Sequence, residues 1–241
     1  MVSKNNKQET TKMHHHEDHL QSSHILKDIV IGMSDGLTVP FALAAGLSGA
    51  VNSTHIIIIA GIAEIAAGSI AMGLGGYLAG KTEEDHYKSE LKKEYLEIET
   101  KREVEIKEVK DVFATWGLSE NTQQLATQEI IKDKEKWVQF MMKHELHLDQ
   151  PDPKRATKSA FNIGLSYIIG GFVPLSPYFF VQQSSYALKI SVIVTLICLF
   201  TFGFFKSKLT GVNPLFGGLK VMLIGAVAAS AAFGIARLIE G

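Results

Sequence analysis

Two apolar stretches near the start of this chain are long enough to cross a membrane, and each contains one acidic residue. Asp35 lies in Ile29–Val51 and Glu64 lies in His55–Gly80, and neither stretch contains a lysine or an arginine. A charged side chain at the centre of a bilayer costs roughly 2.5–3.5 kcal/mol on insertion scales. Because neither acid has a basic partner in its own stretch to offset this cost, we predict that both acids have a functional role inside the membrane.

Charged residues are segregated along the chain of 241 residues. Residues 29–80 carry no charge besides these two acids, whereas residues 81–158 are crowded with lysine and glutamate. The pattern predicts a membrane protein with one soluble insert and argues against a single soluble globule. The first 28 residues are polar, so no cleavable signal peptide is expected. The single Cys198 leaves no partner for an intrachain disulfide.

We predict an all-α fold with five transmembrane helices and a cytosolic three-helix insert between the second and third. A span needs roughly 20 apolar residues. The segments that satisfy this requirement are about 28–51, 55–80, 160–182, 187–205 and 216–239. The expected divisions of the chain are a tail at 1–27, transmembrane helices at 28–80, the insert at 81–158 and transmembrane helices at 159–241.

Prolines fall inside two of these spans. Pro174 and Pro177 are expected to break the outer end of the third span, because proline cannot donate a backbone hydrogen bond. Pro40 is expected to kink the first span, with neighbouring helices satisfying the freed carbonyl.

The distribution of basic residues predicts the orientation of the spans. With five spans, every lysine and arginine except Lys189 and Arg237 falls on the same side of the membrane. Cytosolic segments carry an excess of these residues. The N-terminal tail and the insert are therefore predicted to lie in the cytosol.

The acids and one methionine form a predicted ladder through the membrane. At 1.5 Å per residue, Asp35 and Met72 lie about 10 and 12 Å from the cytosolic ends of their helices. Glu64 lies about 12 Å deeper than Met72. Carboxylates with a thioether suit a divalent transition metal, so we predict a passage for such an ion. The alternatives are helix packing for Met72, a helix cap or kink for Asp35, and a structural hydrogen bond for Glu64.

The insert is predicted to contain three helices. Residues 84–113 lack glycine and proline and indicate one long helix. Ser119 is placed to cap a short second helix, and a third is expected from about Asp133 to Leu148.

Two glutamate pairs are predicted to share one face of the long helix. Glu94 and Glu97 are three residues apart, and Glu105 and Glu108 repeat the spacing about 16 Å along the axis. That distance is too great for one ion to bridge both pairs, so the spacing allows more than one metal. The alternative is an ordinary solvated helix rich in glutamate and lysine.

Five strings of the sequence are distinctive: SDGLTVPFALAAGLSG at 34–49, AMGLGGYL at 71–78, FMMK at 140–143, DPKRA at 152–156 and GGFVPL at 170–175. Through these strings the chain resembles the vacuolar iron transporter family over about residues 25–240. His144, directly after the Met-Met pair, departs from the apolar residue that is more usual there.

This resemblance implies a homodimer of five-span subunits with the ion path at the dimer interface. It implies export of cytosolic Fe²⁺ into a vacuole in exchange for protons, with no enzymatic activity and no prosthetic group. Asp35, Glu64 and Met72 are implied as ligands along the path. The insert is implied to be a metal-binding domain, with ligands Glu94, Glu97, Glu105, Glu108, Met141, Met142 and Glu145.

Other functions are compatible with parts of this pattern. A metal-sensing membrane scaffold needs only the insert. A transporter mainly for Mn²⁺ could use the same ligands, and these ligands also bind Co²⁺ and Zn²⁺. A ferritin-like di-iron enzyme needs two Glu-x-x-His motifs, and only Glu83–His86 fits. The expected partners are a second copy, metal ions, protons and membrane lipid, and no nucleic acid. The histidine tract at His14–His16 is expected to bind metal weakly at most.

Overall fold

The computed structural model describes residues 18–240, and these residues form an all-α fold. The histidine tract at His14–His16 lies outside the described residues. The helices are α1 (Asp18–Ala50), α2 (Thr54–Thr100), α3 (Arg102–Thr115), α4 (Glu120–Ile130), α5 (Lys134–His144), α6 (Arg155–Phe180), α7 (Ser184–Leu209) and α8 (Pro214–Glu240).

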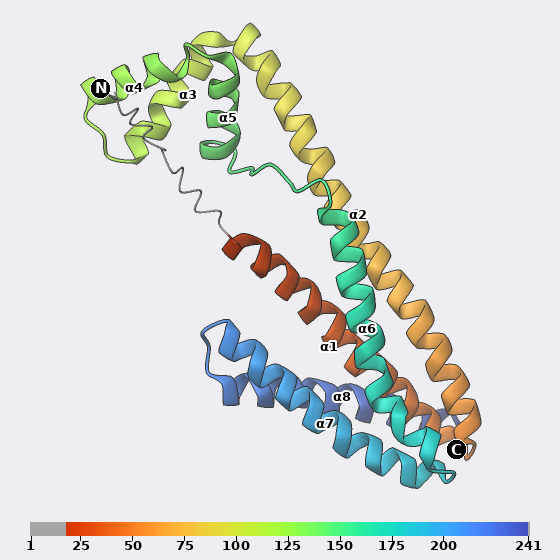
Figure 1. Cartoon of the computed structure of the whole chain (residues 1–241). Helices are drawn as coiled ribbons and strands as arrows, with labels where there is room; N and C mark the ends of the chain where they lie inside the picture. Colours follow the sequence, from red (N-terminus) through yellow and green to blue (C-terminus); the bar gives the residue numbers. More distant parts are fainter. Residues whose placement is uncertain (1–17, 241) are drawn as a thin grey trace, which may run out of the picture.

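The predicted five spans are confirmed as helices that are long and apolar enough to cross a membrane. They are His24–Ala50, Thr54–Thr100, Arg155–Phe180, Ser184–Leu209 and Pro214–Ile239. α6 packs against both α1 and α2, whereas α7 and α8 form a hairpin that packs mainly on α1 (Figure 1). α1 and α2 are thus held together largely through α6.

The prediction that prolines break the third span is wrong. α6 continues through Pro174 and Pro177 to Phe180, and α1 likewise continues through Pro40. Pro177 cannot donate to the carbonyl of Val173, but the Ser176 hydroxyl donates to that oxygen at 2.8 Å. A local side chain therefore replaces the missing backbone donor, as serine commonly does in membrane helices.

The prediction of one long helix over residues 84–113 is also wrong at one point. α2 continues without interruption from the membrane to Thr100, and the helix then breaks at Lys101, where φ is −129° and ψ is 32°. No glycine or proline marks this position, so local sequence gives no signal. The physical reason for the break is the packing of the two helix arms on either side of it.

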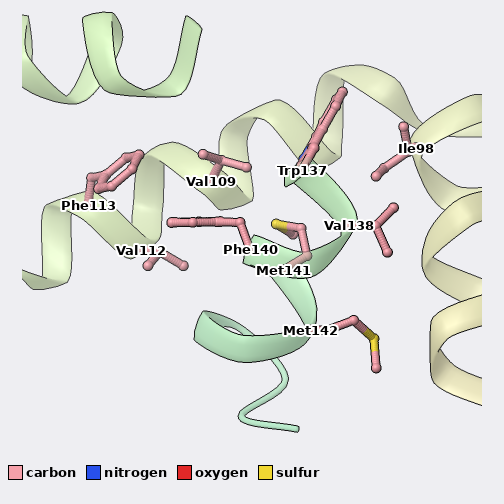
Figure 2. Packing of buried hydrophobic residues seen from close by; sticks show 9 residues of the cluster. All are labelled: Ile98, Val109, Val112, Phe113, Trp137, Val138, Phe140, Met141 and Met142. Carbon is pink, nitrogen blue, oxygen red and sulfur yellow. The ribbon is translucent and has the colours of Figure 1, made fainter. Parts of the chain in front are cut away.

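The break lets both arms of the bend bury apolar side chains against α5. Figure 2 shows this cluster, in which α2 supplies Ile98, α3 supplies Val109, Val112 and Phe113, and α5 supplies Trp137, Val138, Phe140, Met141 and Met142. A straight helix could not present the two arms to one partner. The Arg102 guanidinium, directly after the break, lies 5.0 Å from the Trp137 ring centroid, which is a favourable cation–π distance.

The two shorter helices of the insert lie close to their predicted positions. α4 begins at Glu120, directly after Ser119, as predicted. The Ser119 hydroxyl lies 2.8 Å from the Thr122 hydroxyl, however, and makes no capping hydrogen bond to the backbone. α5 is capped by Asp133, whose Oδ1 accepts from the backbone N–H groups of Glu135 and Lys136 at 3.0 and 3.2 Å. It ends at His144, four residues earlier than predicted.

Candidate functional site

Glu64 is held inside the membrane region by a tyrosine from another helix. The Tyr167 hydroxyl, on α6, donates a hydrogen bond to Oε1 of Glu64, on α2. The other oxygen, Oε2, is buried and has no hydrogen-bond partner among the described residues. Buried carboxylate oxygens are normally satisfied, so an unpartnered one is a candidate ligand for a cation.

Tyr167 lies between the two helices that carry the predicted path residues. A Cβ added at Gly36 on α1 would lie 2.3 Å from the Tyr167 carbonyl oxygen, and one added at Gly68 on α2 would lie 2.4 Å from its hydroxyl. Asp35 precedes Gly36, and Met72 is one helical turn beyond Gly68. The backbone therefore brings the segments of all three predicted residues to one tyrosine.

The predicted path residues differ from ordinary core residues in their exposure. Asp35, Glu64 and Met72 are all half-buried, whereas Tyr167 behind them is only 2% exposed. They thus lie at the edge of the packed helices and not in their centre. Tyr167 was not predicted from the sequence, although a polar aromatic residue inside an apolar span is a signal that could have indicated it.

A second buried acid, which the sequence analysis also missed, lies near the cytosolic end of α1. Asp28 is 1% exposed and accepts two hydrogen bonds from the Arg155 guanidinium, at 2.6 and 3.0 Å. The Ser159 hydroxyl donates to it at 3.0 Å and the Asn162 amide at 3.4 Å. Because all four of these hydrogen bonds come from α6, Asp28 joins the start of the first span to the start of the third.

In the insert, the bend at Lys101 brings together two predicted metal ligands. Glu94 from α2 and Glu105 from α3 are each 3% exposed, and their carboxyl groups lie within hydrogen-bonding reach. The expectation that these residues lie too far apart to bind one ion is therefore wrong. It assumed a straight helix, and the chain folds back between them. Each keeps one buried oxygen that has no hydrogen-bond partner within residues 18–240.

The surroundings of these carboxyl groups favour their protonated forms. Burial, strengthened by the nearby Glu105 charge, raises the pKa of Glu94 to about 8. Burial also raises the pKa of Glu105. Burial, together with the charges of Glu108 and Glu105, raises the pKa of Glu145 to about 7. Acids that repel each other in a buried site are typical of places where a cation binds.

The remaining predicted ligands of the insert differ in their surroundings. Glu97 pairs with Lys101 at 2.8 Å, and this hydrogen bond lowers the pKa of Glu97. Met141 and Met142 are 0% and 1% exposed and belong to the apolar cluster, where they point in different directions from α5 (Figure 2). Among the described residues, no three His, Cys, Asp or Glu side chains are close enough to hold one ion together. The insert thus presents a buried carboxylate pair and not a complete cage.

Comparison with known proteins identifies the family. The model of the VIT family matches residues 26–237, which is most of the chain. The chain belongs to the VIT family. Among VIT-family relatives, "Vacuolar iron transporter 1" of Arabidopsis thaliana is 48% identical over 227 residues, which cover 94% of this chain and 91% of that protein.

Two further relatives match most of this chain. "Vacuolar iron transporter" of Centaurea cyanus is 49% identical, covering 92% of this chain and 91% of its own length. "Protein CCC1" of Saccharomyces cerevisiae is 37% identical, covering 89% of this chain and 69% of its own length. The matches include both the five spans and the insert, so the resemblance inferred from short strings extends over the whole architecture.

Proposed function

We propose that this VIT-family protein moves cytosolic Fe²⁺ across the membrane of a vacuole or similar storage organelle in exchange for protons. The names of its relatives support iron as the cargo. The observation that carries the proposal is the buried, unpartnered Oε2 of Glu64 inside an apolar span. One carboxylate oxygen in such a place can bind either a proton or a metal ion, and competition between them is the minimum requirement for exchange.

Asp35 and Met72 would bind the ion before it reaches Glu64. The three residues are half-buried along α1 and α2, and a thioether beside carboxylates favours a borderline divalent metal such as Fe²⁺ over Mg²⁺ or Ca²⁺. The ion would pass from the cytosolic mouth to Glu64 and then to the far side. Mn²⁺, Co²⁺ and Zn²⁺ are further candidate substrates, because the same ligand types bind them.

The insert would gather metal from the cytosol for this path. Glu94 and Glu105 share a buried site with free oxygens, and Glu97, Glu108 and Glu145 lie around it. A cation there relieves the repulsion between the carboxylates, which favours binding. The sulfur atoms of Met141 and Met142 are the remaining candidate ligands from α5.

We propose that two copies form a homodimer that closes the path. In one copy, the surface of α2 beside Glu64 exposes large apolar side chains, including Ile62 at 44% and Ile70 at 71%. The half-buried ligands lie next to this surface. A second copy would shield the ion from lipid and could double the number of ligands around it. The basic residues favour a cytosolic N-terminus and insert in each copy.

Uptake of Fe²⁺ into proteoliposomes tests the proposal. Acidifying the interior should accelerate uptake, and uptake should make the interior more alkaline. Glu64→Gln should stop both effects while the protein still inserts, because glutamine cannot lose a proton or bind the ion as an anion. An Fe²⁺ uptake rate that does not change with the proton gradient would rule out exchange of Fe²⁺ for protons. No flux of any metal, with binding retained in the insert, would favour the metal-sensing scaffold.

A further inference from the structure

The Tyr167 hydroxyl determines how many oxygens Glu64 can offer to an ion. It donates to Oε1, and Oε2 has no hydrogen-bond partner in the part of the chain that the structure describes. Tyr167 is 2% exposed and enclosed by helix packing, which keeps the hydroxyl from leaving easily. A cation that used both oxygens of Glu64 would have to share Oε1 with the phenol or displace it.

Glycines from two neighbouring helices hold the tyrosine in this position. Gly68 leaves room for the ring, because a Cβ there would lie 2.4 Å from the hydroxyl and 2.5 Å from Cζ. Gly36 leaves room for its backbone. Gly75, also on α2, does not take part, since a Cβ there would meet nothing within 4 Å. The contact with Glu64 thus depends on a specific pair of close approaches.

We infer that Tyr167 is a positioning residue that limits Glu64 to one metal-binding oxygen and thereby discriminates against Ca²⁺. The inference rests on the proposed function, in which Glu64 binds the cargo. Ca²⁺ takes six to eight oxygen ligands and commonly binds carboxylates through both oxygens. Smaller transition metals need fewer ligands and accept sulfur. A one-oxygen Glu64 beside a thioether therefore favours the transition metals.

Tyr167→Phe removes the hydroxyl and keeps the ring. In proteoliposomes that take up Mn²⁺, Ca²⁺ should inhibit this variant about threefold to tenfold more strongly than the wild type, the range that one hydrogen bond corresponds to. Because Glu64 can then bind Mn²⁺ through both oxygens, KM for Mn²⁺ should fall and kcat should fall with it, as release becomes slower.

Tyr178→Phe is the matched control. Tyr178 is on the same helix, is also 2% exposed, and shares a 2.8 Å hydrogen bond with the Ser48 hydroxyl, away from Glu64. Its variant loses an equivalent hydroxyl and should keep the wild-type inhibition by Ca²⁺. Equal changes in the two variants would assign Tyr167 an ordinary packing role and overturn the inference.

A second pair of variants tests the same contact without changing the tyrosine. Gly68→Ala should displace the ring and reproduce the stronger Ca²⁺ inhibition, whereas Gly75→Ala should leave it unchanged. If Tyr167→Phe or Gly68→Ala transports Mn²⁺ with unaltered Ca²⁺ inhibition, the inference is wrong and the proposed function stands. If the wild type transports no metal, the proposed function itself fails.

Discussion

Glu94 and Glu105 come from two different helices and bury their carboxyl groups beside each other at the bend after Thr100. The apolar cluster around α5 holds the two arms together, and this packing places two acids side by side in a buried site, where ionising both is unfavourable. Without a cation, two neighbouring acids in such a site cost stability once they ionise, because burial and mutual repulsion both disfavour the charged forms. The arrangement is therefore better explained as a site kept for a cation, and its titration is open to measurement.

Stability of the metal-free insert should fall as the pH rises. The pKa of Glu94 is raised from 4.5 to about 8 by folding. Between these values the folded state binds a proton that the unfolded state has lost, so the stabilisation is complete below pH 4.5 and disappears as the pH passes about 8. Glu94→Gln cannot ionise and should melt about 4 °C or more above the wild type at pH 8.5.

Tryptophan fluorescence of the full-length protein can follow this unfolding selectively. The chain has two tryptophans, and both Trp116 and Trp137 lie in the insert. The exposed Glu120 offers the control, since its side chain is 87% exposed and Glu120→Gln should not alter the pH dependence. A melting temperature that rises between pH 5 and 8.5 in the wild type would contradict the raised pKa.

Metal binding to the insert should become tighter over the same pH range. A cation needs ionised carboxylates, so its binding releases the protons that Glu94 and Glu145 hold near neutral pH. Calorimetry in buffers of different ionisation enthalpy should detect this release. Replacing Glu94, Glu97, Glu105 and Glu108 together by alanine should remove both the binding and the metal-induced gain in stability. Unchanged affinity in that variant would eliminate these ligands.

The parts of the fold that follow from composition were predictable. Five apolar segments of sufficient length predicted the five spans, because an apolar helix in a bilayer has few alternatives. The break at Lys101 was not predictable, since the residues around it are good helix formers. It results from burial of Ile98 and Val109 in one cluster, a contact between helices that local patterns do not encode.

The candidate site shows the same division. Glu64 was predicted because an acid in an apolar span is unusual by itself. Tyr167 was missed, because its role depends on α6 lying against both α1 and α2. Asp28 and Arg155 lie far apart in the sequence and at the edges of spans, where charges are common, so their pairing was not predicted.

Met72→Leu should separate the chemical role of the sulfur from its packing. The volumes are similar, and such substitutions usually cost under about 1.5 kcal/mol, so the variant should fold and insert. It loses a soft ligand, whereas the carboxylates that suit Mn²⁺ remain. Transport of Fe²⁺ and Co²⁺ should therefore fall more than that of Mn²⁺. Equal losses for all three ions, at equal protein incorporation, would indicate a packing role.

The ion pair between Asp28 and Arg155 should be important for the stability of the spans. Asp28→Ala leaves the partly buried Arg155 guanidinium, 19% exposed in its side chain, without its partner. Removing one member of a buried pair costs about 3–5 kcal/mol, because the remaining charge stays poorly solvated. Thermal unfolding in detergent should show this loss directly.

A double variant and a surface control complete this last test. Asp28→Leu combined with Arg155→Met should recover much of the stability, since an apolar pair of similar volume replaces the charges without leaving either unpaired. Lys158→Gln removes an exposed ion pair, in which Nζ of Lys158 lies 2.6 Å from Oδ2 of Asp152. This substitution should lower the free energy of unfolding by under about 1 kcal/mol. If Asp28→Ala costs no more than Lys158→Gln, the network at the start of α6 does not hold α1 in place.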